Sequence, residues 1–150
     1  MILQLATVDD VEILMPFVRA YHEFEGIEAT EIERARSVAP LLSDASLGRV
    51  WLILDGGQAA GYIAACFGYS IEFGGRDAFL DEFFITPSAR SQGLGSKALE
   101  AVKTEMMQLG VRAMHLEVAR TNSGAKQFYS KSGFVPREHF HLMSCRLYGG

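Results

Sequence analysis

The segment Phe83–Lys97 reads FFITPSARSQGLGSK and joins a strand to a helix through a turn that contains two glycines. The run that leads into it, Ala78–Ile85, is apolar and acidic and predicts a strand, which Pro87 ends. Apolar side chains then recur at steps of three and four residues from Leu94 to Leu109, and Gly110 follows. This spacing predicts an amphipathic helix that begins directly after the turn.

The turn itself offers backbone N–H groups to a ligand. Those of Gly93, Gly95 and Ser96 would converge at the positive end of the helix dipole, and glycine has no Cβ to keep an anion away. The turn could therefore bind a phosphate group, or it could be an ordinary connection between a strand and a helix. A dinucleotide-binding turn is disfavoured because Ala98 stands where that motif has its third glycine. A Walker-type loop is excluded because the turn lacks Gly-Lys-Ser/Thr.

A second polar and aromatic segment, Leu116–Phe134, lies further along the chain. It predicts a strand that leads into a short helix over residues 123–131, with Asn122 as the N-cap and Gly133 after the end. Taken together, the two segments closely resemble the GNAT superfamily of acyl-CoA-dependent N-acyltransferases. The motifs that carry the resemblance are Arg90-x-x-Gly93-x-Gly95 and Asn122-x-x-Ala125-x-x-Phe128-Tyr129-x-x-x-Gly133-Phe134.

The resemblance is strong from Leu80 to Phe134 and extends more loosely over the whole chain. It implies a single N-acetyltransferase domain over residues 1–150, of α/β (α+β) class. The expected fold is a mixed, mostly antiparallel central sheet of about six to seven strands with flanking helices, in which two splayed strands hold acyl-CoA. The residue patterns predict strands at 2–6, 49–54, 59–68, 78–85, 111–119, 135–137 and 140–147, and helices at 11–25, 30–42, 94–109 and 123–131.

The resemblance also implies acetyl-CoA as the acyl-donor substrate. The pantetheine arm would lie along the strand before the turn, much as an added strand pairs with a free sheet edge. The pyrophosphate would lie in the turn, which agrees with the separate argument from the helix N-terminus. The cofactor-binding residues expected on this basis are Phe83, Phe84, Ile85, Arg90, Ser91, Gln92, Gly93, Leu94, Gly95, Ser96, Asn122 and Tyr129.

Tyr129 resembles the general acid of the family. A phenol with an ordinary pKa near 10 is protonated at neutral pH and can donate to the departing CoA thiolate. The attacking amine must in turn lose a proton, and Asp81 and Glu82 are the candidate catalytic bases, acting directly or through water. Glu117 on the next strand is a third candidate. Each of these carboxylates could instead be a solvated or ion-paired surface group.

Strict alternation along the strand places Asp81 and Glu82 on opposite faces of the sheet. Asp81 would share its face with Phe83 and Ile85, and Glu82 would share the other with Leu80 and Phe84. The pattern does not decide which face meets the acceptor.

Acidic and aromatic residues gather in the region where the resemblance places acceptor contacts, at the end of the first long helix. The candidate substrate-binding residues are Tyr21, Glu23, Glu25 and Glu28. Such a cluster suits a cationic amine, such as a polyamine, an aminoglycoside or a lysine side chain, through charge pairing and cation–π contact. The alternative is a solvated helix end.

The composition indicates a packed globular protein, with 49% hydrophobic and 21% charged residues among 150. A net charge of −4 argues against binding to nucleic acid. The longest apolar runs, such as 51–54 and 62–67, are much shorter than the roughly 18 residues that a membrane span needs. No membrane association is expected, and the lack of a visible leader favours the cytoplasm.

Neither the cysteines nor the histidines of the chain form a recognisable site. Cys66 and Cys145 lie in predicted strands, where a buried thiol is the common case. His115, His139 and His141 do not have metal-ligand spacing, so no metal is expected. The strands near the C-terminus could pair across a homodimer.

The leading hypothesis from the sequence is therefore direct transfer of an acetyl group from acetyl-CoA to a primary amine in a ternary complex. No covalent enzyme intermediate is required, because neither cysteine lies in the motifs. A non-catalytic sensor that keeps the acyl-CoA cleft is the alternative. A nucleotide-dependent oxidoreductase is disfavoured by the incomplete glycine pattern.

Overall fold

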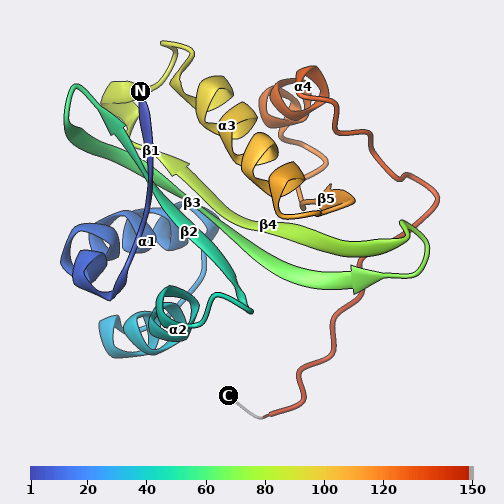
Figure 1. The fold of residues 1–150 in the computed structure, drawn as a ribbon, viewed down its shortest axis with the longest axis horizontal. Coiled ribbons are helices and arrows are strands. Elements are labelled where there is room, and N and C mark those ends of the chain that lie inside the picture. The colour runs from blue at the N-terminus through green and yellow to red at the C-terminus, as the bar shows by residue number, and fades with distance from the viewer. Residues whose placement is uncertain (149–150) are drawn as a thin grey trace.

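The computed structural model describes residues 1–148, in which five strands form one sheet in the order β1-β2-β3-β4-β5 (Figure 1). Neighbouring strands are antiparallel except β4 and β5, which run parallel. The elements are β1 (Ile2–Leu5), η1 (Val8–Asp10), α1 (Val11–Glu25), α2 (Glu31–Ser43), β2 (Gly48–Asp55), β3 (Gln58–Ser70), β4 (Gly75–Ile85), η2 (Pro87–Ala89), α3 (Leu94–Gln108), β5 (Ala113–His115) and α4 (Ser123–Lys131).

The helices cover the two faces of the sheet, with α1 and α2 on one face and α3 and α4 on the other (Figure 1). Alternate side chains of β2 enter the two resulting cores, as the strand period of two requires. Trp51 packs in the core that contains Leu99 of α3, and Leu52 packs in the core that contains Leu14 of α1. The sheet is therefore buried on both faces.

The helix boundaries follow the local sequence signals. Thr30 and Glu33 form the predicted capping box, in which the Thr30 side chain accepts from the Glu33 N–H (3.2 Å) and the Glu33 carboxylate accepts from the Thr30 N–H (2.7 Å). The first long helix ends at Gly26, whose φ of 70° is the left-handed conformation of a helix C-cap. Within residues 1–148, every helix is too short or too polar to cross a membrane.

The sheet is smaller than predicted, with five strands rather than six to seven. The strand expected at 111–119 is limited to Ala113–His115, and the strands expected at 135–137 and 140–147 are not formed. A strand needs a hydrogen-bonded neighbour as well as suitable residues. Residues 132–148 run past the hairpin between β3 and β4 and away from the sheet, so this described part of the chain has no such neighbour (Figure 1).

A β-bulge interrupts β4 at Asp81. Ala64 of β3 pairs with Glu82, whereas the next residue, Ala65, pairs with Leu80, so Asp81 is an extra residue in the strand. Leu80 consequently packs in the α3-side core, whereas Glu82 contacts Tyr62, which belongs to the α1-side core. The prediction that Leu80 and Glu82 share a face is therefore wrong, because strict alternation holds only for an unbulged strand.

Candidate functional site

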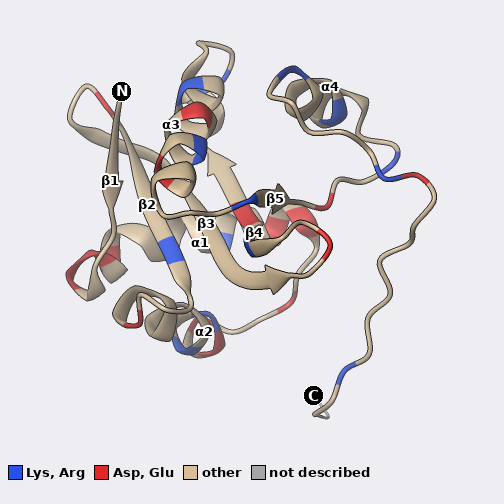
Figure 2. Ribbon diagram, turned by 45° about the vertical axis from the view of Figure 1, so that its right-hand side comes forward, with Lys and Arg blue, Asp and Glu red and all other residues tan. Residues whose placement is uncertain are grey.

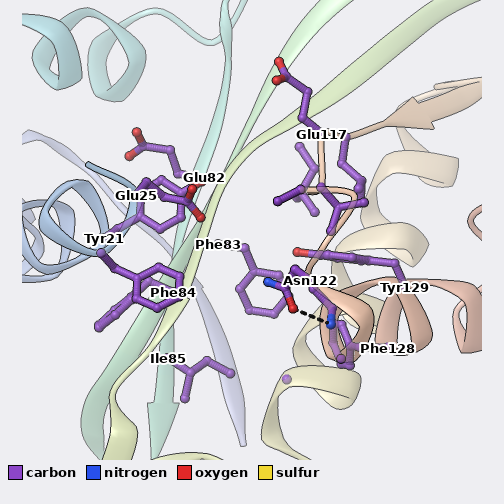
Figure 3. A pocket seen from close by; sticks show the side chains of 18 of the residues that line it. Tyr21, Glu25, Glu82, Phe83, Phe84, Ile85, Glu117, Asn122, Phe128 and Tyr129 are labelled. Carbon is purple, nitrogen blue, oxygen red and sulfur yellow. Dashed lines mark hydrogen bonds between the residues drawn. The ribbon is translucent and has the colours of Figure 1, made fainter. Parts of the chain in front are cut away.

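The site begins where β4 and β5 separate. The two strands pair for three residues only, from Asp77 opposite Ala113 to Phe79 opposite His115. Beyond this point, residues 80–85 present a backbone edge with which no strand pairs among the described residues. An open cleft of about 1350 Å³ lies beside this edge, with side chains of β4 on one wall and of α4 on the other (Figure 3). The expected splay of two strands is thus present.

The glycine turn closes one end of the cleft. The first hydrogen bond of α3 runs from the Lys97 N–H to the Gly93 carbonyl (3.2 Å), so the N–H groups of residues 94–96 have no partner within the helix. Gly93 has a φ of 76°, a conformation that glycine adopts without strain. The space at its Cβ position is open. Ser91 also has a positive φ, 65°, a strained conformation of the kind found in ligand-binding loops.

Two contacts hold the turn against the end of β4. The Arg90 guanidinium donates from Nε to the Ile85 carbonyl (2.7 Å) and lies 5.4 Å from the centre of the Phe84 ring. A Cβ at Gly95 would lie 3.3 Å from the Ile85 side chain and 3.4 Å from that of Phe128, so glycine lets α3 approach both. The turn is therefore fixed relative to both walls of the cleft.

Tyr129 lies on the α4 wall, and its hydroxyl points into the gap between α4 and β4 (Figure 3). Its ring packs edge-on against Phe128 and Phe134, with centroids 5.1 and 5.7 Å away. Burial, together with the negative charge of Glu25, raises the pKa of Tyr129 to about 12. The hydroxyl therefore remains a hydrogen-bond donor well above neutral pH.

Asn122 has the N-capping role predicted for it and also lines the cleft. Its side-chain oxygen accepts from the Ala125 N–H (3.1 Å), drawn as a dashed line in Figure 3. An amide group has donors besides this acceptor, so capping leaves Asn122 able to donate to a ligand.

Glu82 is held by a network that connects β4 with three other elements, β3, α1 and α2. Its two carboxylate oxygens accept from the Tyr62 hydroxyl and the His22 Nε2, each at 2.7 Å. Arg34 is buried, donates from Nε to the His22 Nδ1 (3.3 Å) and pairs with Glu31 (2.7 Å). Arginine can only donate, so Nδ1 accepts and Nε2 carries the hydrogen that points to Glu82. The network therefore fixes both the tautomer of His22 and the orientation of Glu82.

The second carboxylate, Asp81, is placed differently. It lies on the bulge and lines the cleft, and its partial burial, together with the charges of Glu82 and Glu117, raises its pKa. Burial also raises the pKa of Tyr62 and, with help from Glu25 and Glu82, that of Tyr21. Both phenols are therefore protonated donors at neutral pH.

The end of the cleft at which the resemblance places the acceptor is formed by α1 and the loop after it. Tyr21 and Glu25 line the cleft together with Phe24 and Ile27. Tyr21 and Glu25 lie four residues apart and so share one face of the helix, whereas Glu23 does not line the cleft. Glu28, in the loop that follows the helix, also lies outside it.

Most of the residues expected from the sequence lie together in this cleft. Its lining includes all three candidate catalytic residues and the following expected cofactor contacts: Phe83, Phe84, Ile85, Arg90, Ser91, Gly93, Gly95, Ser96, Asn122 and Tyr129. Leu94 is instead buried in the α3-side core, and Gln92 faces a smaller hollow beside Thr86.

No local sequence pattern indicates the network around Glu82. Tyr62, His22 and Arg34 come from β3, α1 and α2, and their spacing from Glu82 follows no local pattern. The feature that could have been noticed is a single arginine on a helix face that is otherwise apolar. Arginine is rarely buried unless it is paired, so such a residue indicates a partner.

Charge differs between the two sides of the cleft. Figure 2 shows acidic residues where β4 faces β5 and basic residues on α4, whereas α3 carries both kinds. This distribution suits a cationic group beside β4 and an anionic group beside α4. Within the described chain, no cluster of three His, Cys, Asp or Glu side chains could hold a metal ion.

The chain matches one family model and is similar to two proteins that are named as N-acetyltransferases. The model of the acetyltransferase (GNAT) family matches residues 13–134. A protein of Archaeoglobus fulgidus named as an N-acetyltransferase is 31% identical over 127 residues, which cover 81% of this chain and 86% of that protein. The N-acetyltransferase YhfO of Bacillus subtilis is 22% identical, with 86% of each chain covered.

A solved structure shares nearly the whole fold. It is an integron cassette protein from the mobile metagenome of Cole Harbour Salt Marsh, with a TM-score of 0.86 and 33% identity. The match covers 99% of this chain and 91% of the cassette protein.

Proposed function

Because the chain belongs to the acetyltransferase (GNAT) family, we propose that it transfers an acetyl group from acetyl-CoA to a primary amine while both substrates are bound. The observation that carries the proposal is the unpaired edge of residues 80–85 beside the free N–H groups of the turn. The amides of a pantetheine arm can pair with such an edge as an added strand does. The pyrophosphate is then close to the helix N-terminus, which favours an anion.

We assign Glu82 as the catalytic base that deprotonates the amine. An alkyl ammonium with a pKa near 10.4 has no lone pair for attack until it loses a proton. Glu82 accepts hydrogen bonds from Tyr62 and His22, and a carboxylate has about four lone-pair sites, so sites remain for the amine or a bridging water. The network also fixes the direction from which this carboxylate can accept the proton.

The amine nitrogen then attacks the thioester carbonyl carbon to form a tetrahedral intermediate. A backbone N–H on the free edge of β4 stabilises its oxyanion. As the carbon–sulfur bond breaks, the nitrogen loses its second proton to water, the amide forms and CoA leaves as the thiolate. Tyr129 donates a hydrogen bond to the departing thiolate. With a pKa of about 12, against about 8.5 for a thiol such as cysteine, Tyr129 stabilises the charge more readily than it gives up its proton.

The acceptor in this proposal is cationic. Glu25 and Tyr21 lie at the acceptor end, and they offer a carboxylate and an aromatic ring to an ammonium group. A polyamine, an aminoglycoside and a lysine side chain all present such a group, and a panel of these amines separates them.

Calorimetric titration with acetyl-CoA, with NADH for comparison, tests the cofactor assignment. Gly93→Glu would place a carboxylate against the pyrophosphate, and Gly110→Glu is its matched control. Both glycines have positive φ and open space at opposite ends of α3, but only Gly93 lines the cleft. Since like charges brought together cost several kcal/mol, we expect the Kd for acetyl-CoA to rise about 100-fold for Gly93→Glu alone.

Release of CoA in the presence of the amine panel tests the transfer itself. Turnover with one class of amine supports the proposal. Binding of acetyl-CoA without turnover of any amine would indicate that the protein is an acyl-CoA sensor and not an enzyme. Equal binding of NADH would contradict the assignment of acetyl-CoA as the donor.

A further inference from the structure

The last turn of α1 places a carboxylate between apolar side chains at one end of the cleft. Glu25 lines the cleft together with Phe24 and Ile27, whose exposed fractions are 68 and 43%. Gly26 ends the helix in the left-handed conformation, and the Ile27 N–H then donates to the His22 carbonyl (2.8 Å). This cap holds the three side chains at the cleft. Exposed apolar side chains that line a cleft are typical of a binding surface.

The surroundings of Glu25 favour a cation. Among residues 1–148, no basic side chain pairs with it. The cleft is lined by four carboxylates and by a single basic side chain, that of Arg90, which already donates to the Ile85 carbonyl. Burial raises the pKa of Tyr21 and of Tyr129, and the charge of Glu25 adds to both shifts. The C-terminal carbonyl groups of α1 add partial negative charge at the same place.

The reacting amine does not supply this cation. In the proposed reaction Glu82 removes its proton, so the nitrogen is neutral when it attacks the thioester. Glu82 lies on β4 and Glu25 on α1, and Figure 3 shows both on the wall of the cleft opposite Tyr129. A positive charge that stays beside Glu25 during the reaction therefore belongs to a second group of the acceptor.

On the basis of the proposed acetyl transfer, we propose that the acceptor is a linear diamine or polyamine, in which one amine reacts beside Glu82 while a second ammonium group pairs with Glu25. Methylene groups of the same chain pack against Phe24 and Ile27. An aminoglycoside fits less well, because its hydroxyl groups would face these apolar side chains without hydrogen bonds. The side chain of a lysine has one ammonium group, and none remains for Glu25.

Calorimetry with the full-length protein in the presence of CoA measures acceptor binding without acetyl transfer. The probes are linear diamines of increasing length, each compared with the amino alcohol in which a hydroxyl replaces one ammonium. We expect the diamine of the best length to bind about tenfold more tightly than its amino alcohol, because a charge-assisted hydrogen bond is lost in the latter. Equal Kd values at every length, or no binding of any diamine, would overturn the proposal.

Charge-removing variants test where the second ammonium binds. In Glu25→Gln the preference for the diamine over the amino alcohol should disappear. Glu23→Gln removes the same charge from the same turn of α1, but Glu23 does not line the cleft, so the preference should stay within about twofold of wild type. A preference retained in Glu25→Gln, or lost equally in both variants, would contradict the assignment to Glu25.

Phe24→Ala tests the apolar contact, and Ile32→Ala is its matched control. Both side chains are exposed, at 68 and 65%, so both variants should fold, but only Phe24 lines the cleft. Loss of contact with one or two methylene groups should raise the Kd of the best diamine about tenfold in Phe24→Ala alone. The same Kd in Phe24→Ala and Ile32→Ala would show that the methylene chain does not contact Phe24.

Release of CoA from acetyl-CoA separates failure of this inference from failure of the proposed function. Faster acetylation of a monoamine, an aminoglycoside or a lysine peptide than of every diamine would overturn the diamine assignment and leave acetyl transfer intact. A diamine preference in binding that depends on Glu25, without transfer to any amine, would support the assignment and contradict the proposed reaction.

Discussion

At the scale of single residues, the two neighbouring carboxylates of β4 have different surroundings. Glu82 is oriented by Tyr62 and His22, whereas Asp81 lies on the bulge with a raised pKa. Their order in the sequence does not distinguish them, but their hydrogen bonds do. The two side chains can therefore be tested against each other by isosteric substitution.

Glu82→Gln is expected to lower kcat/KM for the amine about 100-fold, because the amide keeps the size of the side chain but cannot take a proton. Asp81→Asn is the matched control and should stay within about threefold of wild type, since its effect is only electrostatic. Steady-state kinetics with the best amine of the panel measures both. A larger loss of kcat/KM in Asp81→Asn than in Glu82→Gln would identify Asp81 as the catalytic base.

The same Asp81→Asn variant is expected to be more stable than wild type at pH 7. Burial and the nearby charges raise the pKa of Asp81 in the folded protein, so the ionised form disfavours folding at pH values above that pKa. The advantage should shrink as pH falls, because wild-type Asp81 becomes protonated as well. Thermal unfolding at pH 7 and pH 4 measures the difference, and a constant or inverted difference would argue against the raised pKa.

Tyr129→Phe should lower kcat by about 100-fold with little change in the Kd of acetyl-CoA, because one hydrogen bond to the transition state is lost. The ring that packs on Phe128 and Phe134 is kept, so folding should be unaffected. Tyr69→Phe, at an exposed tyrosine of β3, is the control.

The pKa of about 12 predicts in addition that wild-type kcat does not fall between pH 8 and pH 10 through loss of the Tyr129 proton. A phenol with an ordinary pKa near 10 would already be half ionised at the upper limit. An alkaline decrease in kcat that is centred near pH 10 and absent in Tyr129→Phe would show that burial does not hold this proton.

At the scale of elements, the position of a threonine decides what its hydroxyl contributes. Thr30 caps α2, so Thr30→Ala should lower the free energy of unfolding by about 1 kcal/mol. Thr104 lies inside α3 and bonds back to the Glu100 carbonyl (3.0 Å), so Thr104→Ala should be neutral or stabilising by less than about 0.7 kcal/mol. Urea denaturation measures both, and equal losses would contradict the capping argument.

The turn and α3 could be predicted from the sequence because their signals are local. Gly93 and Gly110 lie at the two ends of a helix whose apolar positions recur regularly, and Asn122 caps the next helix as expected. These elements depend on neighbours within a few residues along the chain. They also contain seven of the ten expected cofactor contacts that line the cleft.

What could not be predicted depends on contacts between distant segments. The bulge at Asp81 arises from pairing with β3, which periodicity in β4 alone does not reveal. The strands expected at 135–137 and 140–147 had suitable residues but lacked a strand partner within residues 1–148. The orientation of Glu82 depends on His22, which is 60 residues away in sequence.

At the scale of the whole molecule, one sheet forms a wall of both cores, so the two cores should unfold together. Leu14 and Leu99 are both fully buried, one on each side of the sheet. Leu14→Ala and Leu99→Ala should each cost about 2–5 kcal/mol, and the domain should still unfold in one transition.

The fluorescence of Trp51, the single tryptophan, reports on the α3-side core, and circular dichroism reports on all helices. Both signals should therefore shift together in both variants. If Leu14→Ala moved the circular dichroism transition but left that of Trp51 unchanged, the two cores would unfold separately.

The bulge at Asp81 also limits which mutations can alter the shape of the cleft. It is defined by how many residues lie between Leu80 and Glu82, so a point mutation can change the side chain there but cannot remove the extra backbone unit. Loss of the Asp81 codon would restore regular alternation and leave the core leucine and the carboxylate on the faces that they now occupy, because the two would then be neighbours in the strand. Chemistry at this position can therefore evolve through single-base substitutions, whereas its geometry changes only through insertion or deletion.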